Sequence, residues 1–134
     1  MNYWLIKSEP GTYSWDDFIK EKRTHWDGVR NYQARNNIKA MMPDDLALFY
    51  HSVKNPAVIG IAKVVSEFYP DPTIDDDRWV VVDVVPVRKL KIPVTLAQVK
   101  AEDSLSEMVL VKNSRLSVQP VLPEEFKAIL ALGD

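Results

Sequence analysis

The sequence predicts an α+β fold built on a mainly antiparallel, curved sheet. Stretches rich in β-branched and aromatic residues alternate with short amphipathic patterns along the 134 residues. No regular β–α–β rhythm runs through the chain, which disfavours a Rossmann-type parallel sheet. With 46% hydrophobic residues, a chain of this length is expected to form one domain, residues 1–134, around its own core.

The first elements are predicted from β-formers and from a helix-start signal. Residues 3–6 are rich in β-formers and indicate a short strand, which Pro10 and Gly11 end. Ser14 followed by Asp17 resembles a capping box, so a helix should run over residues 15–22. Residues 24–30 are then expected to form a loop.

A second helix is predicted from Asn31 to about Met41, because Ala34, Ile38 and Met41 recur one turn apart as a buried stripe. Its opposite face carries Tyr32, Asn36 and Lys39, with Arg35 at the edge. The remaining elements are predicted as strands over 46–52, 57–68 and 79–90, helical turns within 95–108, short strands over 109–111 and 117–118, and a closing helix from Pro123 to Leu132.

Several classes of chemistry lack the residues they require. There is no cysteine, and His25 and His51 are the only histidines, so thiol chemistry and zinc centres are disfavoured. The sequence contains neither a Walker A pattern nor a GxGxxG pattern, the glycine-rich motifs that bind nucleotide phosphates. We therefore expect no cofactor and no metal. The opening residues do not resemble a signal peptide, and no apolar run is long enough to span a bilayer. A cytoplasmic protein without membrane contact is expected, assumed here to be a monomer.

The net charge argues against nonspecific binding along duplex nucleic acid, but it does not exclude a local basic patch. The formal net charge is −2, whereas proteins that bind nucleic acid mainly by charge are usually basic. Six basic residues nevertheless lie between Lys20 and Lys39, against only Glu21 and Asp27. Ordinary solvated surface charge is the alternative interpretation.

Two clusters could carry a function. Lys7 and Glu9 lie at a strand end, where a lysine beside a carboxylate can act as a base or an electrostatic clamp, or simply form an ion pair. Trp26 precedes a polar stretch, and Tyr50 precedes His51 and Ser52. An aromatic wall with a few directional polar groups suits a planar nucleobase, although large aromatics more often belong to the core.

Four ordered motifs resemble one known family, the EVE domains. They are WLIKSEP from Trp4, WDGVRNYQARNN from Trp26, FYHS from Phe49 and RLSVQPV from Arg115. The resemblance runs nearly end to end. It implies a PUA-like fold, a small curved β-barrel with flanking short helices, and kinship with the YTH domains that read methylated adenine in RNA. One departure is a short loop over residues 71–78, where family members usually carry a longer one.

The resemblance also implies a function and a set of residues. The expected function is non-catalytic binding of a modified base, with modified cytosine in DNA as the leading candidate and a modified RNA base as the alternative. The pocket residues carried over by motif are Lys7, Ser8, Glu9, Trp26, Val29, Arg30, Asn31, Tyr32, Asn36, Tyr50, His51, Ser52, Arg115, Ser117 and Gln119.

Roles within this set are hypotheses. Trp26 and Tyr50 would stack on the base, while Ser8, Asn31 and Asn36 would bind its edge. The residues expected to face phosphate are Lys7, Arg30, Arg35 and Lys39. One alternative is a hydrolase of small modified nucleosides that uses Lys7 and Glu9. Another is a small-molecule sensor or protein-interaction module without nucleic acid.

Overall fold

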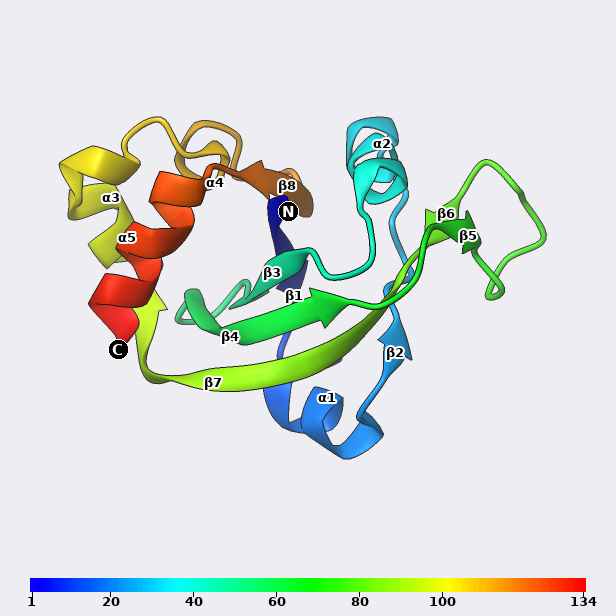
Figure 1. Cartoon of the computed structure of the whole chain (residues 1–134), viewed down its shortest axis with the longest axis horizontal. Helices are drawn as coiled ribbons and strands as arrows, with labels where there is room; N and C mark the ends of the chain where they lie inside the picture. Colours follow the sequence, from blue (N-terminus) through cyan, green and yellow to red (C-terminus); the bar gives the residue numbers. More distant parts are fainter.

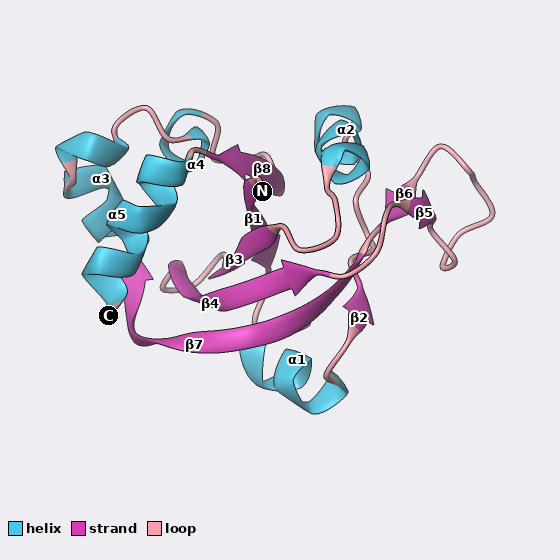
Figure 2. Ribbon diagram, in the orientation of Figure 1, coloured by secondary structure: helices cyan, strands magenta, loops and turns pink.

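The computed structural model describes residues 1–134 and has a strongly curled six-stranded sheet at its centre (Figures 1 and 2). The strand order is β2-β7-β4-β3-β1-β8. The strands of this sheet are β1 (Tyr3–Ser8), β2 (Thr24–His25), β3 (Leu46–His51), β4 (Ala57–Val64), β7 (Asp83–Thr95) and β8 (Val118–Val121). Only β1 and β3 pair in parallel, so the predicted α+β class and the mainly antiparallel, barrel-like curvature are confirmed.

Short helices flank the half-barrel, and a small hairpin extends from it (Figure 1). The helices are α1 (Trp15–Glu21), α2 (Tyr32–Ala40), α3 (Leu96–Ala101), the 3₁₀ turn η1 (Asp103–Leu105), α4 (Val109–Lys112) and α5 (Pro123–Gly133). The hairpin consists of β5 (Tyr69–Pro70) and β6 (Val80–Val81). None of the helices combines the length and apolar character needed to cross a bilayer.

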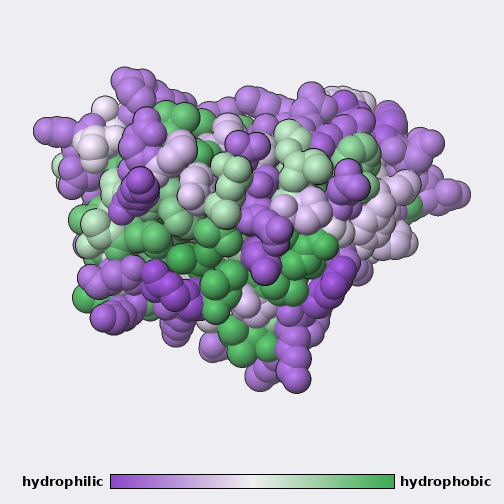
Figure 3. Space-filling view, in the orientation of Figure 1, coloured by the Kyte–Doolittle hydropathy of each residue, from purple (hydrophilic) through white to green (hydrophobic).

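Alternation along the central strands divides the core between the two faces of the sheet. In β1, Trp4 and Ile6 join a cluster with α1 and α2, whereas Leu5 joins a second cluster with α3, α4 and α5. In β3, Phe49 belongs to the first cluster and Tyr50 to the second. Residues neighbouring in sequence therefore face different environments. On the surface, apolar side chains gather around β4, β7 and α5 and are framed by polar groups (Figure 3).

The predicted helix starts are confirmed in detail. The Ser14 hydroxyl accepts from the Asp17 amide at 3.1 Å, and the Asp17 carboxylate accepts from the Ser14 amide at 2.9 Å. The Asn31 side chain caps α2 by accepting from the Ala34 amide at 3.0 Å. Pro123 occupies the first turn of α5, where its missing N–H costs nothing.

Four predicted boundaries were wrong. Residues 24–25, expected in a loop, form β2 through pairing with β7. Residues 109–111, expected as a strand, begin α4, where the Val111 and Lys112 amides bond back to the Met108 carbonyl. The strand predicted over 57–68 ends at Val64. The strand predicted over 79–90 is instead two strands, β6 and β7, and β7 continues to Thr95.

Candidate functional site

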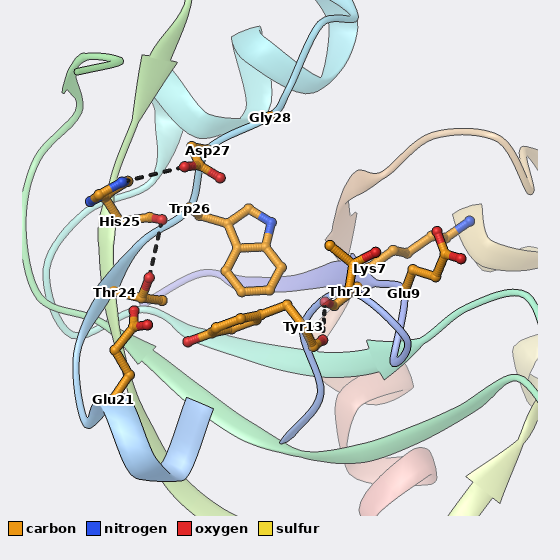
Figure 4. Close-up of a pocket in the computed structure, with 11 residues that line it drawn as sticks. Lys7, Glu9, Thr12, Tyr13, Glu21, Thr24, His25, Trp26, Asp27 and Gly28 are labelled. Carbon is orange, nitrogen blue, oxygen red and sulfur yellow. Dashed lines mark hydrogen bonds and ion pairs between the residues drawn. The ribbon is translucent and has the colours of Figure 1, made fainter. Parts of the chain in front are cut away.

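A cavity of about 520 Å³ opens between the end of β1, the loop that leads into α1, and the chain that leaves β2. Its lining residues are Lys7, Ser8, Glu9, Thr12, Tyr13, Glu21, Thr24, His25, Trp26, Asp27 and Gly28 (Figure 4). A volume of this size falls in the range of small-molecule sites. The cavity is therefore the candidate site, and four of the residues predicted from sequence line it: Lys7, Ser8, Glu9 and Trp26.

Two aromatic rings form the wall of the cavity. Trp26 and Tyr13 meet edge to face, with centroids 6.2 Å apart and planes at 77°. Trp26 also packs edge to face against Phe49 at 5.6 Å, and its amide donates to the Val82 carbonyl at 2.9 Å. Only 8% of Trp26 is exposed. The core thus holds this indole in place before any ligand arrives.

Hydrogen bonds fix the loop that carries Tyr13. The Ser8 hydroxyl donates to the Tyr13 carbonyl, and the amides of Thr12 and Tyr13 both donate to the Glu9 carbonyl, at 2.9 and 2.8 Å. The Ser8 carbonyl in turn accepts from the Ser52 amide at 2.9 Å and from the Ser52 hydroxyl at 3.3 Å. Ser8 and Ser52 therefore shape the cavity through its backbone rather than by offering free hydroxyls.

The Tyr13 hydroxyl is buried and has no hydrogen-bond partner within normal geometry. The side chains of Glu21 and Thr24 lie beside it at one end of the cavity (Figure 4). Burial raises the pKa of Tyr13 to about 12, and the Glu21 charge acts in the same direction. The phenol therefore stays protonated at neutral pH.

Lys7 contributes to the lining, but its ammonium turns away from Trp26 (Figure 4). The ammonium donates to the Ser114 carbonyl and lies 5.7 Å from the centre of the Tyr50 ring. No ion pair joins Lys7 to Glu9, contrary to the simplest interpretation of that motif. Burial lowers the pKa of the Lys7 ammonium, which makes this amine easier to deprotonate.

Residues 29–31 leave the cavity and support α2. Val29 is buried in the core. The Arg30 guanidinium donates to the Val29 carbonyl at 2.8 Å and pairs with Asp71 at 3.3 Å. Asn31 is occupied as the helix cap. None of these three side chains lines the cavity.

The exposed side of α2 forms a surface outside the cavity. Tyr32 is 53% exposed and stacks on Trp79 with centroids 5.2 Å apart. Arg35 lies 4.9 Å from the Tyr32 ring centre and donates to the Asn36 side chain at 2.9 Å. Lys39, farther along the helix, lies 5.8 Å from the Phe68 ring centre. We call Tyr32, Arg35, Asn36 and Lys39 the α2 surface.

The FYHS strand supports the site from behind. Tyr50 is buried in the cluster on the opposite face of the sheet from Trp26, so the structure does not bring these two rings together. The Nε2 of His51 accepts from the Trp15 amide at the start of α1, at 3.1 Å. Desolvation lowers the pKa of His51, as expected for an imidazole that must stay neutral to accept this bond.

The RLSVQPV segment is also outside the cavity. Arg115 is exposed, and the Ser117 carbonyl accepts from the Lys7 amide at 3.0 Å. Gln119 is fully buried and donates to the Leu116 carbonyl at 2.8 Å. This motif therefore builds the strand beside β1 rather than the cavity wall.

The lining residues that sequence analysis did not place in the pocket are Thr12, Tyr13, Glu21, Thr24 and His25, whereas Asp27 and Gly28 lie within the WDGVRNYQARNN motif without having been named individually. The glycine at position 28 was itself a signal, because glycine readily adopts left-handed conformations. Gly28 has such a conformation here, with φ of +76°. Thr24 and His25 reach the cavity through the pairing of β2 with β7, which no local pattern showed. Thr12 and Tyr13 are held there by the hydrogen bonds of their loop to Ser8 and Glu9. The structure contains no cluster of three or more His, Cys, Asp or Glu side chains that could hold a metal ion.

Comparison with known proteins places this geometry in a family. The EVE domain model matches residues 2–132. Thymocyte nuclear protein 1 of Mus musculus is 41% identical over 167 residues, covering 99% of this chain and 74% of the mouse protein. Because that alignment is longer than the 134-residue chain, the mouse protein carries residues without a counterpart here.

Solved structures agree with the sequence comparison and with the predicted PUA-like fold. A protein from Agrobacterium tumefaciens has a TM-score of 0.96 and 45% identity, covering 99% of this chain and 93% of that one. Human THYN1, solved in complex with DNA containing 5-methylcytosine, has a TM-score of 0.90 and 38% identity, covering 100% of this chain and 98% of the human one. Because the family model matches residues 2–132, nearly the whole of this chain, the chain belongs to the EVE domain family.

Proposed function

We propose that this protein binds one modified nucleobase in the cavity walled by Trp26 and Tyr13, as a reader that performs no chemistry on it. The observation that carries the proposal is the cavity itself. It combines a volume of about 520 Å³ with a fixed aromatic wall and several polar groups at its ends. This combination suits a flat, polar-edged ring.

Modified cytosine in DNA is the leading ligand. Human THYN1, which shares this fold at a TM-score of 0.90, was solved with DNA that contains 5-methylcytosine. A modified RNA base is the alternative within the same proposal, since single-stranded RNA also presents bases that can be splayed into a pocket.

The energetics require contacts beyond the base. Extracting a paired base costs a few kcal/mol, whereas stacking on an aromatic ring returns about 1–3 kcal/mol. Burying one methyl group adds about 0.8 kcal/mol, close to a fourfold gain in affinity. Arg35 and Lys39 on the α2 surface form no ion pair with a carboxylate. They are available to phosphates, and the chain from Trp26 leads directly to them.

Filling the cavity tests the proposal without disturbing the core. Thr12 is exposed at the cavity, so Thr12→Trp introduces a ring there at little cost to folding. The matched control is Ser106→Trp, an exposed position beside η1 and away from the cavity. Fluorescence anisotropy with a single-stranded oligonucleotide carrying one 5-methylcytosine should show at least tenfold weaker binding for Thr12→Trp alone. Equal affinity of the two variants would reject the cavity as the binding site.

One observation favours a second function. The lowered pKa of Lys7 is a property of lysines that act as bases. A nucleoside hydrolase using Lys7 and Glu9 would need the ammonium to leave Ser114 and turn into the cavity. Mass spectrometry after incubation with modified nucleosides decides between the two functions. We expect intact nucleosides, and product formation that is lost in Lys7→Met would establish the hydrolase.

A further inference from the structure

The charged groups that line the cavity are mainly acidic. Glu9, Glu21 and Asp27 contribute carboxylates. Of the two basic lining residues, Lys7 sends its ammonium to the Ser114 carbonyl, and His25 pairs with Asp27 at 3.3 Å. Glu9 and Glu21 form no ion pair. A ligand inside the cavity therefore meets uncompensated hydrogen-bond acceptors.

Glu21 is the carboxylate best placed to meet the edge of a stacked base. It lies at the end of α1, and its carboxylate turns toward the Tyr13 hydroxyl and Thr24 at one end of the aromatic wall (Figure 4). Glu9 lies at the opposite end, beside the Lys7 side chain (Figure 4). A ring packed on Trp26 or Tyr13 would direct one of its edges at Glu21.

We propose that Glu21 makes the cavity selective for bases whose inward edge carries an exocyclic amino group, so that cytosine-type bases are accepted and thymine-type bases are rejected. This inference rests on the proposed base-binding function and adds the side chain that selects the base. A carboxylate only accepts hydrogen bonds, so it pairs with an amino group and repels a carbonyl oxygen.

The pair 5-methylcytosine and thymine isolates this effect. Both bases carry the same methyl group on the same ring, so stacking and methyl burial are nearly equal. They differ in the amino group or carbonyl at ring position 4 and in the proton on the neighbouring nitrogen. Thymine still offers one ring N–H, but that donor lies between two carbonyl oxygens. It approaches a carboxylate only by bringing one of those oxygens close to it.

The expected discrimination follows from the strength of a charged hydrogen bond. Such a bond contributes about 1.5–3 kcal/mol, which corresponds to about 10-fold to 150-fold in affinity. The experiment is a titration of the full chain with two single-stranded oligonucleotides that differ only in 5-methylcytosine or thymine at one position. Single strands are used so that duplex stability does not enter the comparison. We expect the 5-methylcytosine strand to bind at least tenfold more tightly.

A substitution then tests the role of Glu21 itself. Glu21→Gln keeps the size of the side chain but can donate as well as accept, so the ratio of the two affinities should fall to within about threefold. Glu124→Gln, on the exposed side of α5, is the matched control and should keep the full ratio.

Each outcome separates this inference from the proposed function. Equal binding of the two strands, with loss of both in Thr12→Trp, would overturn the selectivity and keep base binding in the cavity. An unchanged ratio in Glu21→Gln would overturn the role of Glu21. Equal binding that Thr12→Trp leaves intact would overturn both, because the bases would then bind outside the cavity.

Discussion

The cavity and the α2 surface derive from one continuous motif but have opposite physical characters. Trp26 is 8% exposed and packed against Phe49, whereas Tyr32 is 53% exposed and contacts Trp79, Arg35 and Arg78. The cavity carries the carboxylates of Glu9 and Glu21, which form no ion pair, while the α2 surface carries the cations of Arg35 and Lys39, which also form none. The difference fits the proposed function, in which the cavity binds the base and the α2 surface binds the flanking phosphates.

Removing the indole of Trp26 is the strongest way to break this comparison. Trp26→Ala should destabilise the fold by about 3–5 kcal/mol, since the ring belongs to the core as well as to the cavity. It should also weaken oligonucleotide binding by roughly 5-fold to 150-fold through lost stacking. Urea unfolding and anisotropy titrations below the unfolding transition measure the two effects separately.

Trp79→Ala is the matched control, because Trp79 is exposed to the same 8% but lies in the stack with Tyr32. It should reduce stability while leaving the affinity for the isolated modified nucleoside unchanged. If Trp26→Ala and Trp79→Ala weakened nucleoside binding equally, the distinction between the two regions would be lost.

A smaller effect is expected at the glycine that joins the two regions. At Gly28, φ is +76° and a Cβ would meet no atom within 4 Å, so Gly28→Ala acts through backbone strain alone, about 1–2 kcal/mol. Gly11→Ala has equal space without the left-handed φ and should be neutral or slightly stabilising. Urea midpoints with unchanged m-values check the pair. Equal midpoints would show that the chain relaxes at Gly28.

The cations of the α2 surface should affect strands but not free bases. Arg35→Gln combined with Lys39→Gln should lower the salt dependence of single-strand binding by about 0.7 per removed charge. Binding of the free modified nucleoside should stay the same. Lys127→Gln on α5 is the exposed control. Affinity measured between 50 and 200 mM salt checks the slope, and an unaltered slope in the double variant would remove phosphate binding from the α2 surface.

The smallest expected effect is a pH dependence from His51. Its folded pKa is lowered by burial, so the unfolded chain binds more protons and stability is lost as pH falls below about 6.5. Protonation also removes the acceptor for the Trp15 amide, and a hydrogen bond of this kind contributes about 0.5–1.5 kcal/mol. Asp17, whose pKa is lowered by bonds from Ser14, contributes only at more acidic pH.

Denaturant midpoints between pH 7 and pH 4.5 measure this dependence. His51→Gln retains an acceptor but cannot titrate, so the decline over this interval should become shallower. An identical decline in the variant would assign it to other groups.

Local signals predicted the elements that local interactions stabilise. The Ser14–Asp17 capping box and Pro123 marked helix starts correctly, because caps act within one turn. The same approach missed β2, which exists only through its pairing with β7. It also assigned Val109 to a strand, because β-branched residues favour strands on average while the surrounding hydrogen bonds here form a helical turn.

The lining of the candidate cavity was predicted in part, for a comparable reason. The ordered motifs located Trp26 and the end of β1, and both stretches line the cavity. They also included Tyr50 and Gln119, which are buried on or beside the strands that support the cavity. A motif records every residue that a site needs, including those that only hold its strands in place. Glu21 and Thr24 lie outside the motifs and reach the cavity through tertiary structure alone.

The most direct test is a crystal structure of this chain with a short strand containing one 5-methylcytosine. We expect the modified ring in the cavity, packed on Trp26 or Tyr13 with its amino edge toward Glu21, and the flanking phosphates near Arg35 and Lys39. A base bound against Tyr32 and Trp79, with the cavity filled only by solvent, would contradict the assignment of the cavity as the base-binding site.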